Sequence, residues 1–329
     1  MDVYIQKTGT KIKKEKNHFL IRTKEKNNLV APSKIDSFII EENISITTNA
    51  IKLAIDNDIA IYLSDNYGNI FGKFWKSGFE RTSRIRSKQL IVFRSKYGNC
   101  IGKKWIIEKI ETQKNHIKKL YKRKGIDFSF EENNMDKIIR EIENISIDEE
   151  NYSNRIMGYE GIASSLYYSR IGRLLPQELN FKGRVNRGAK DIYNIVLNYS
   201  FGILYKKINH FLIVSGMDPK VGIFHTNINN KDALLYDFIE PYRFLAWEVV
   251  FNIFSKKLFN KAYYDTKTEK LTFEGRKLIL TKMYNKLEKK IGKDNKNCSY
   301  NNTIKKNIIN LVKDLLENEV YNNLWYFKK

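Results

Sequence analysis

The spacing of hydrophobic residues changes near residue 75. Before that point, apolar residues stand in short β-branched or alternating runs, and turn residues such as Gly9, Pro32 and Gly68 separate them. The runs predict strands at 3–5, 11–13, 19–21, 35–40, 59–63 and 70–74, interrupted by one helix at 48–56. Thr47 or Thr48 would cap that helix.

From Lys88 onward the pattern favours helices. Residues 105–120 and 191–215 have apolar residues three and four apart, and residues 242–259 are apolar nearly all round, which is typical of a central buried helix. We therefore expect an α+β fold. A small β-rich N-terminal domain would cover residues 1–75, a hinge would cover 76–90, and a larger all-α domain would cover 91–329.

Composition adds a strong positive charge. Lys and Arg number 59 against 37 Asp and Glu, so the formal net charge is +22, which predicts a polyanionic partner, either nucleic acid or an anionic membrane surface. No run approaches the roughly 20 apolar residues of a membrane span, and the N-terminus lacks a signal-peptide pattern. Cys100 and Cys298 are far apart, and we interpret them as free thiols in a reducing cytoplasm. We expect a cytoplasmic protein without a membrane partner.

Candidate chemistry lies at a histidine and three acids. Asp237 and Glu240 follow His225 and would share one face of a helix, which Pro241 permits only if that helix begins near Asp237. Glu160 stands among apolar residues and needs a partner. If Glu160, His225 and Glu240 converge, their two carboxylates and one imidazole suit Mg2+ or Mn2+.

Other interpretations of these residues stay open. A histidine near two acids is also typical of a surface hydrogen-bond cluster, and Glu160 could instead form a salt bridge with Arg155 or Arg170. The glycines that flank Glu160, Gly158 and Gly161, suit close helix packing. Zinc hydrolysis is disfavoured because the chain has no HExxH. We interpret His210, on the apolar segment 191–215, as structural, and His18 and His116 have no group of acids near them in the sequence.

Several short motifs together resemble the Cas1 integrases of CRISPR adaptation. They are Gly158-Tyr-Glu160-Gly, the Gly216-Met-Asp-Pro and Gly222-x-x-His225 stretch, Asp237-x-x-Glu240-Pro-x-Arg243, Lys109-Ile-Glu-Thr-Gln113 and the 187–204 segment. In order and spacing the resemblance covers most of the chain. One departure is visible: many members carry Pro-Pro after the arginine, where this chain has Gly188-Ala189.

The resemblance implies a metal-dependent DNA integrase and endonuclease. Glu160, His225 and Glu240 would hold Mg2+ or Mn2+, and Asp237 would be a further catalytic residue, as a supporting or alternate ligand. The 3′-hydroxyl of an incoming DNA fragment would attack a repeat next to a leader. Implied partners are double-stranded and branched DNA, a second copy of the chain bound through the β-rich domain, and a small Cas2-like protein. A plain β-sandwich without a partner remains the alternative for that domain.

Basic residues suggest where DNA would bind. The candidates are Arg81, Arg84, Lys88, Arg184, Arg187, Arg243, Arg276 and Lys277. Lysine and arginine contacts to phosphate would set affinity and salt dependence but not sequence choice. The same charges are also typical of a solvated face. A non-catalytic nucleic-acid-binding protein and a nuclease that cleaves without joining remain alternative functions.

Overall fold

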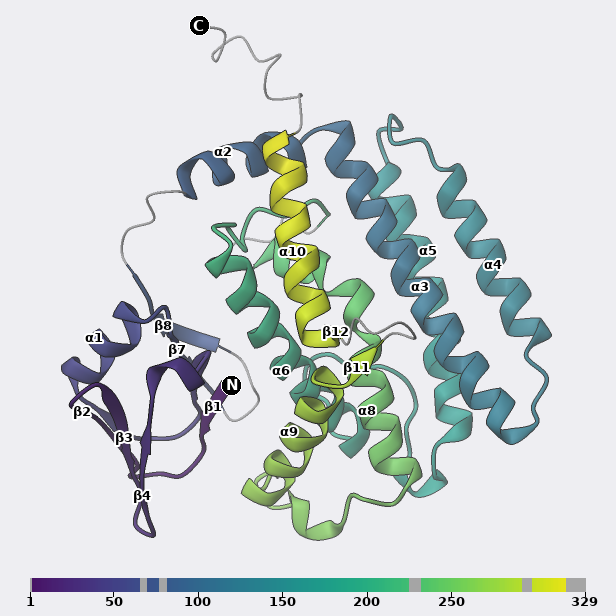
Figure 1. Ribbon diagram of the computed structural model, residues 1–329. Coiled ribbons are helices and arrows are strands. Elements are labelled where there is room, and N and C mark those ends of the chain that lie inside the picture. The colour runs from purple at the N-terminus through teal and green to yellow at the C-terminus, as the bar shows by residue number, and fades with distance from the viewer. Residues whose placement is uncertain (1, 66–69, 77–81, 225–231, 292–297, 318–329) are drawn as a thin grey trace, which may run out of the picture.

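The computed structural model describes residues 2–65, 70–76, 82–224, 232–291 and 298–317 (Figure 1). Its N-terminal part holds two four-stranded sheets, ordered β1-β5-β7-β8 and β4-β3-β2-β6. Their elements are β1 (Asp2–Ile5), β2 (Lys11–Glu15), β3 (His18–Arg22), β4 (Asn27–Val30), β5 (Ser37–Ile40), β6 (Ser45–Ile46), α1 (Thr48–Asp56), β7 (Ala60–Ser64) and β8 (Ile70–Phe74). The predicted strands and helix are thus present, and β4 and β6 are added to them.

The central strands of the first sheet, β5 and β7, are buried on both faces, which explains the continuous apolar run of β5. Phe38 packs edge to face on Phe19 of the second sheet, with ring centroids 4.9 Å apart. Ile39, pointing the other way, packs with Tyr62 of β7, and Tyr62 lies edge-on to His210 of the helical part. Strand alternation therefore gives the sheet one face for its own core and one for the helices.

The helical part begins at Thr82. Its main helices are α2 (Thr82–Phe93), α3 (Lys96–Lys124), α4 (Ser129–Asn144), α5 (Tyr152–Leu174), α6 (Ile192–Val214), α7 (Ala233–Phe238), α8 (Phe244–Ser255), α9 (Phe273–Leu287) and α10 (Tyr300–Glu317). Two short hairpins, β9 (Tyr264–Asp265) with β10 (Lys270–Leu271) and β11 (Lys290–Ile291) with β12 (Cys298–Ser299), interrupt the helices. The α+β fold is confirmed, and these hairpins are a small addition to the expected all-α part.

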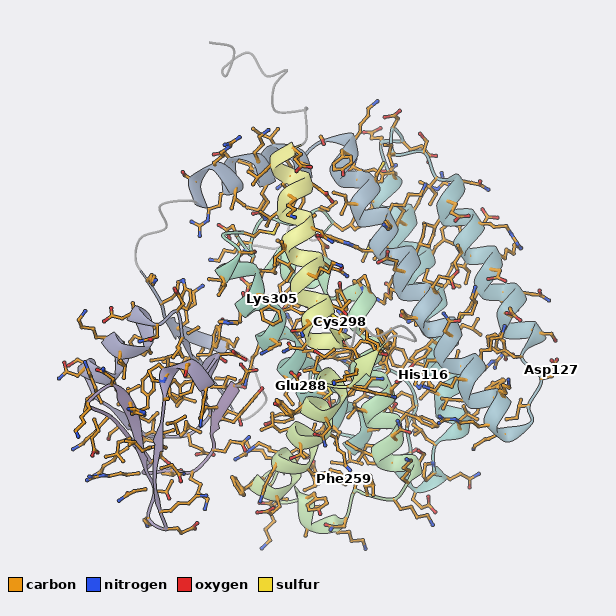
Figure 2. The ribbon with its side chains drawn as sticks, viewed as in Figure 1. His116, Asp127, Phe259, Glu288, Cys298 and Lys305 are labelled. Carbon is orange, nitrogen blue, oxygen red and sulfur yellow. The ribbon has the colours of Figure 1, made fainter. Side chains whose placement is uncertain are left out.

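Helix α6 is buried along most of its length, as the apolar pattern of residues 191–215 predicts, and α8, within the predicted buried helix of residues 242–259, is largely buried too. The side chain of Asp191 caps α6 by accepting a hydrogen bond from the backbone N–H of Asn194, at 2.9 Å. Helices α3, α4 and α5 lie side by side on the flank away from the sheets (Figure 1). His116 of α3 faces Tyr167 of α5 and Phe251 of α8, whereas Asp127 lies at the outer edge of the bundle (Figure 2).

A buried polar cluster joins the strand-rich part to the helices. Glu41, whose side chain has no exposed surface, accepts hydrogen bonds from Lys206 Nζ at 3.1 Å and from the Tyr199 hydroxyl at 3.2 Å, both on α6. Lys206 Nζ also donates to Ser64 Oγ of β7 at 2.9 Å. Because an unpaired carboxylate would be costly at this depth, the cluster fixes how the two parts dock.

Three further predictions can be compared with this structure. The division into domains with a hinge over 76–90 stays a prediction, and α2 makes residues 82–90 helical. Both cysteines are free thiols, as expected. Within the described ranges, no helix is long and apolar enough to cross a membrane.

Candidate active site

Glu160 and Glu240 meet at one buried ammonium group. Lys109 of α3 forms ion pairs with both of them, contacting Glu160 Oε1 of α5 and lying 2.6 Å from Glu240 Oε2. Glu240 begins the short 3-10 helix η3 (Glu240–Tyr242). The three side chains are 9%, 14% and 5% exposed for Lys109, Glu160 and Glu240. Two acids 80 positions apart in sequence are therefore within reach of one cation.

Glu240 has a second cationic partner. Arg243 donates from Nε to Glu240 Oε2 and from Nη2 to Oε1, each at 2.8 Å, in the two-pronged geometry that guanidinium and carboxylate groups favour. Burial alone would raise the pKa of Glu240, but the charges of Arg243 and Lys109 outweigh it and lower that pKa to about 2. Glu240 is therefore ionised and held in one orientation.

Glu160 is oriented by a chain of side-chain hydrogen bonds. Ser164, one turn later on α5, donates to Glu160 Oε1 at 2.7 Å, and Gln113 of α3 donates to Ser164 Oγ at 3.1 Å. The alternative salt bridges of Glu160 are absent, because Arg155 pairs with Glu149 and Arg170 with Glu131. The expected helix packing at the flanking glycines is wrong: a Cβ at Gly158 or Gly161 would meet nothing within 4 Å.

Asp237 faces the backbone that precedes His225. Its Oδ2 accepts the N–H of Ile223 at 2.6 Å and that of Phe224 at 3.1 Å. The expected shared helix face of Asp237 and Glu240 is wrong, because α7 begins at Ala233 and ends at Phe238. Pro241 is accommodated in the first turn of η3 instead, where its missing N–H is not needed. His225 itself lies outside the described residues.

Two more residues fix the same segment. A Cβ on Gly222 would lie 2.6 Å from the backbone carbon of Ala233 and 2.7 Å from Asp237 Oδ2, so only glycine fits there. The fully buried Gln89 donates to the carbonyls of Asp218 and Val221 at 2.8 Å and accepts the N–H of Asp218 at 2.9 Å. The backbone that leads to His225 is therefore held from both α2 and α7.

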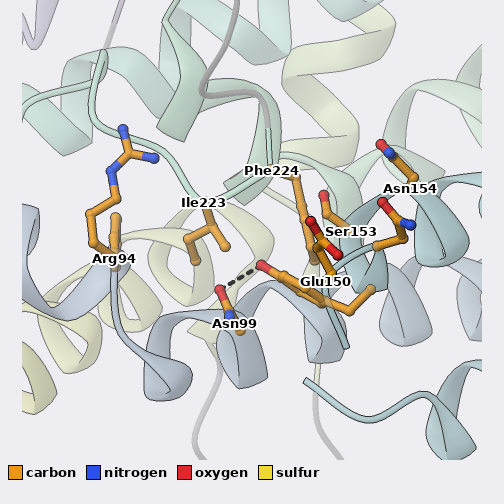
Figure 3. Close-up of a pocket in the computed structure, with 10 residues that line it drawn as sticks. Arg94, Asn99, Glu150, Ser153, Asn154, Ile223 and Phe224 are labelled. Atoms are coloured by element: carbon orange, nitrogen blue, oxygen red, sulfur yellow. Dashed lines mark hydrogen bonds between the residues drawn. The ribbon is translucent and has the colours of Figure 1, made fainter. Parts of the chain in front are cut away.

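A pocket of about 360 Å³ opens beside this segment. Figure 3 shows Arg94 at the left of it, Ile223 above Asn99 near the centre, and Phe224 beside Ser153 at the right. Tyr152 donates to Asn99 at 2.5 Å across its floor. The pocket lies where α3 and α5 begin, next to the chain that enters residue 225.

A second, larger cleft of about 1010 Å³ is rich in basic side chains. Arg184, Arg187 and Arg243 line it. Phe201 lies on its floor, with the guanidinium carbons of Arg184 and Arg243 stacked 5.4 and 4.9 Å from the ring centroid. Since Arg243 also binds Glu240, the cleft borders the carboxylate pair.

The other basic candidates are spread over the surface and the interior. Arg84 and Lys277 are exposed, and Arg81 lies outside the described residues. Two candidates are buried, contrary to the role expected of them. Lys88 is 3% exposed because α2 packs on α3 and α10, and Arg276 is 6% exposed because it donates to Glu42 at 3.1 Å across to the strand-rich part.

The donor set fits a hard divalent cation as far as the structure describes it. Glu160 and Glu240 already share one cation, the Lys109 ammonium, and carboxylate oxygens are what Mg2+ and Mn2+ prefer. Among the described residues, no group of three or more His, Cys, Asp or Glu side chains is gathered for a metal.

Lys109 is the site residue that sequence reasoning missed. The Lys109-to-Gln113 stretch stands out in the sequence, but only as a family resemblance. The sequence feature that could have revealed it is its position beside Ile106 and Ile110 on the buried side of a helix. A lysine buried in this way needs an acidic partner. The identity of that partner depends on packing between helices.

Comparison with known proteins places the chain in a family. Residues 3–285 match the family model described as CRISPR associated protein Cas1, and the chain belongs to this family. The CRISPR-associated protein Cas1 3 of Methanobrevibacter ruminantium is 30% identical over 287 residues, which cover 85% of this chain and 86% of that protein. The CRISPR-associated endonuclease Cas1 2 of Saccharolobus solfataricus is 27% identical over 239 residues, 73% of this chain and 70% of that protein.

A solved structure shares the fold over nearly the whole chain. It is a casposase bound to its integration product, with a TM-score of 0.83 and 20% identity, and the match covers 96% of this chain and 90% of that one. The likeness extends through both the strand-rich and the helical parts.

Proposed function

We propose that this chain is a metal-dependent DNA endonuclease and strand transferase that inserts new DNA into a CRISPR repeat array. The observation that carries the proposal is the shared contact of Glu160 and Glu240 with one buried cation. Membership of the Cas1 family and the names of its endonuclease and casposase relatives support it.

Glu160, His225 and Glu240 would hold the Mg2+ or Mn2+ ion. Bound there, the ion would polarise a phosphodiester and neutralise charge that develops during in-line displacement. The protein's own contribution is orientation: Arg243 locks Glu240, Ser164 locks Glu160, and Asp237 holds the backbone before His225. Such preorganised groups need little rearrangement during the reaction.

The reaction we propose needs no nucleophile from the protein. The 3′-hydroxyl oxygen of the incoming DNA attacks a phosphorus atom of the repeat and gives up its proton. A new phosphorus–oxygen bond forms, the bond to the departing strand breaks, and that strand leaves with a free 3′-hydroxyl. One phosphodiester bond replaces another, so the step requires no energy from a nucleoside triphosphate.

The basic cleft is the route by which we expect DNA to reach the carboxylates. Arg187 is exposed beside the cleft, and Arg184 and Arg243 are stacked on Phe201 at its floor. Guanidinium groups bind phosphate strongly, and stacking on the buried ring of Phe201 holds two of them in place at the cleft. The net charge of +22 favours the same partner.

The proposed protein partners are a second copy of the chain and a small Cas2-like protein. Support for association through the strand-rich part comes from Phe71 of β8 and Leu29 of β4, which are 75% and 56% exposed. Large apolar side chains that open to solvent are common at interfaces. Replacing Phe71 and Leu29 by glutamate should yield a monomer in light scattering. A variant that stays dimeric contradicts this assignment.

Joining of DNA ends in the presence of Mn2+ is the test of the proposed activity. Glu160→Gln, His225→Ala and Glu240→Gln should each lower strand transfer on branched or repeat DNA by at least about a hundredfold, since metal-ligand loss removes several kcal/mol of transition-state stabilisation. The matched control is Glu248→Gln on α8, a half-buried acid that pairs with Lys119 and Lys286. It should retain joining, and thermal unfolding checks that every variant is folded.

Three results would contradict the proposal. Full joining by folded Glu160→Gln and Glu240→Gln would remove the carboxylates from the mechanism. Cleavage without any joined product would indicate a nuclease only. DNA binding with no reaction in Mn2+, unaffected by EDTA, would indicate a non-catalytic binding protein.

A further inference from the structure

Lys109 makes the carboxylate pair electrically neutral. Glu160 and Glu240 contribute two negative charges, and Lys109 and Arg243 contribute two positive charges in direct contact with them. Three of these side chains are less than 15% exposed and Arg243 is 17% exposed. Water therefore screens the four charges poorly.

A divalent cation that enters this group meets two positive charges already in place. To bind both carboxylates it must push the Lys109 ammonium away from them or share them with it. With Lys109 and Arg243 retained, the buried group would then carry an excess of two positive charges. Such an excess is unfavourable unless an anion arrives together with the ion. A DNA phosphate is the anion that the proposed function supplies.

We propose that Lys109 is a positioning residue that makes metal binding at Glu160 and Glu240 depend on DNA. In the DNA-free protein its ammonium group occupies the space between the carboxylates, keeps them in place and opposes the metal. When a phosphodiester enters, its negative charge offsets the added cation and metal affinity rises. By linkage, the metal raises DNA affinity by the same factor. This inference rests on the proposed function.

Mn2+ binding, followed by the loss of its free-ion signal in electron paramagnetic resonance, tests the proposal without measuring activity. The wild type should bind Mn2+ at least about tenfold more tightly with a short blunt DNA duplex than without it. Lys109→Met should bind Mn2+ at least about tenfold more tightly than the wild type in DNA-free buffer, because one like charge at short range is removed. The gain on adding DNA should shrink in that variant.

Lys114→Met is the matched control. Lys114 lies on the same helix, is 13% exposed and pairs with Glu111 and Asp136 instead of the site carboxylates. It should bind Mn2+ as the wild type does. Should Lys109→Met unfold in metal-free buffer, its melting temperature against Mn2+ concentration reports the same affinity, since a ligand that binds only the folded state stabilises it.

The outcomes separate this inference from the proposed function. Mn2+ affinity that Lys109→Met leaves unchanged or weakens would overturn the role of Lys109 alone. A wild type that binds Mn2+ equally well with and without DNA would also overturn the role of Lys109 alone. A wild type that binds no Mn2+ under either condition would overturn the metal-dependent function, and the role of Lys109 with it.

Discussion

The carboxylate of Asp237 lies 2.6 Å from the backbone nitrogen of Ile223, fourteen residues earlier in the chain. This contact ties the last turn of α7 to the segment that enters residue 225. Asp237 therefore acts on backbone position, whereas Glu240, three residues later, faces Lys109 and Glu160. The two acids of one short motif have different physical tasks.

Substitution at Asp237 should distinguish a positioning role from metal ligation. An asparagine carbonyl oxygen still accepts hydrogen bonds, so Asp237→Asn should keep most strand-transfer activity. Asp237→Ala leaves two buried N–H groups unpaired and should lose about 2 kcal/mol or more of unfolding free energy, with a large loss of activity. Steady-state kinetics and urea unfolding of both variants measure these effects. Equal loss of metal affinity in both would indicate a direct ligand instead.

Gly222→Ala should destabilise the protein. The added methyl group would meet the backbone of Ala233 at 2.6 Å, and a clash with backbone is relieved only by moving the chain, at a cost of about 1–3 kcal/mol. Gly158→Ala on α5 is the control, because nothing lies within 4 Å of its Cβ and alanine favours a helix. Urea unfolding should show opposite signs for the two variants. A neutral Gly222→Ala would argue against the tight approach.

DNA affinity should depend on Arg187, which is exposed beside the cleft, rather than on the buried Arg276. Arg187→Ala should weaken binding and reduce the slope of log affinity against log salt by about one. Arg276→Ala should instead lower stability, because it removes a buried side chain and its 3.1 Å ion pair with Glu42. Fluorescence anisotropy over a salt series and thermal unfolding measure the two effects. A reduced salt slope for Arg276→Ala alone would reverse this assignment.

Acid should destabilise the helical part through His116. Burial lowers the pKa of His116 from an ordinary 6.5 to about 4, so between these pH values the unfolded chain takes up a proton that the folded protein does not. This stability is fully present above pH 6.5 and is lost as the pH falls to about 4, by on the order of 2–3 kcal/mol.

His116→Gln should flatten that dependence. Urea unfolding at a series of pH values across the interval measures it, and the variant should be less stable than the wild type at neutral pH. The reason is loss of the 2.8 Å contact between His116 Nδ1 and the Tyr167 hydroxyl. His210, whose pKa burial also lowers to about 4, keeps part of the slope. Identical pH profiles for wild type and variant would contradict the assignment.

Local sequence was sufficient where each residue's environment follows from its near neighbours. The apolar face of α6 and the cap of α1 at Thr47 depend on residues within one or two turns. Asn27 and Asn28, by contrast, are of a residue type that favours turns, yet they belong to β4 because pairing with Arg22 and Ile21 overrides that preference.

Residue type and short-range periodicity predicted most of the strands and helices in their order, the positive charge and the acids that need partners. The packed structure was needed to place Lys109 between Glu160 and Glu240, to show that Asp237 binds backbone N–H groups, and to show that Lys88 and Arg276 are buried. Such contacts arise when segments that are separate in the sequence pack against one another, as Lys109 and Glu160 do across 51 positions.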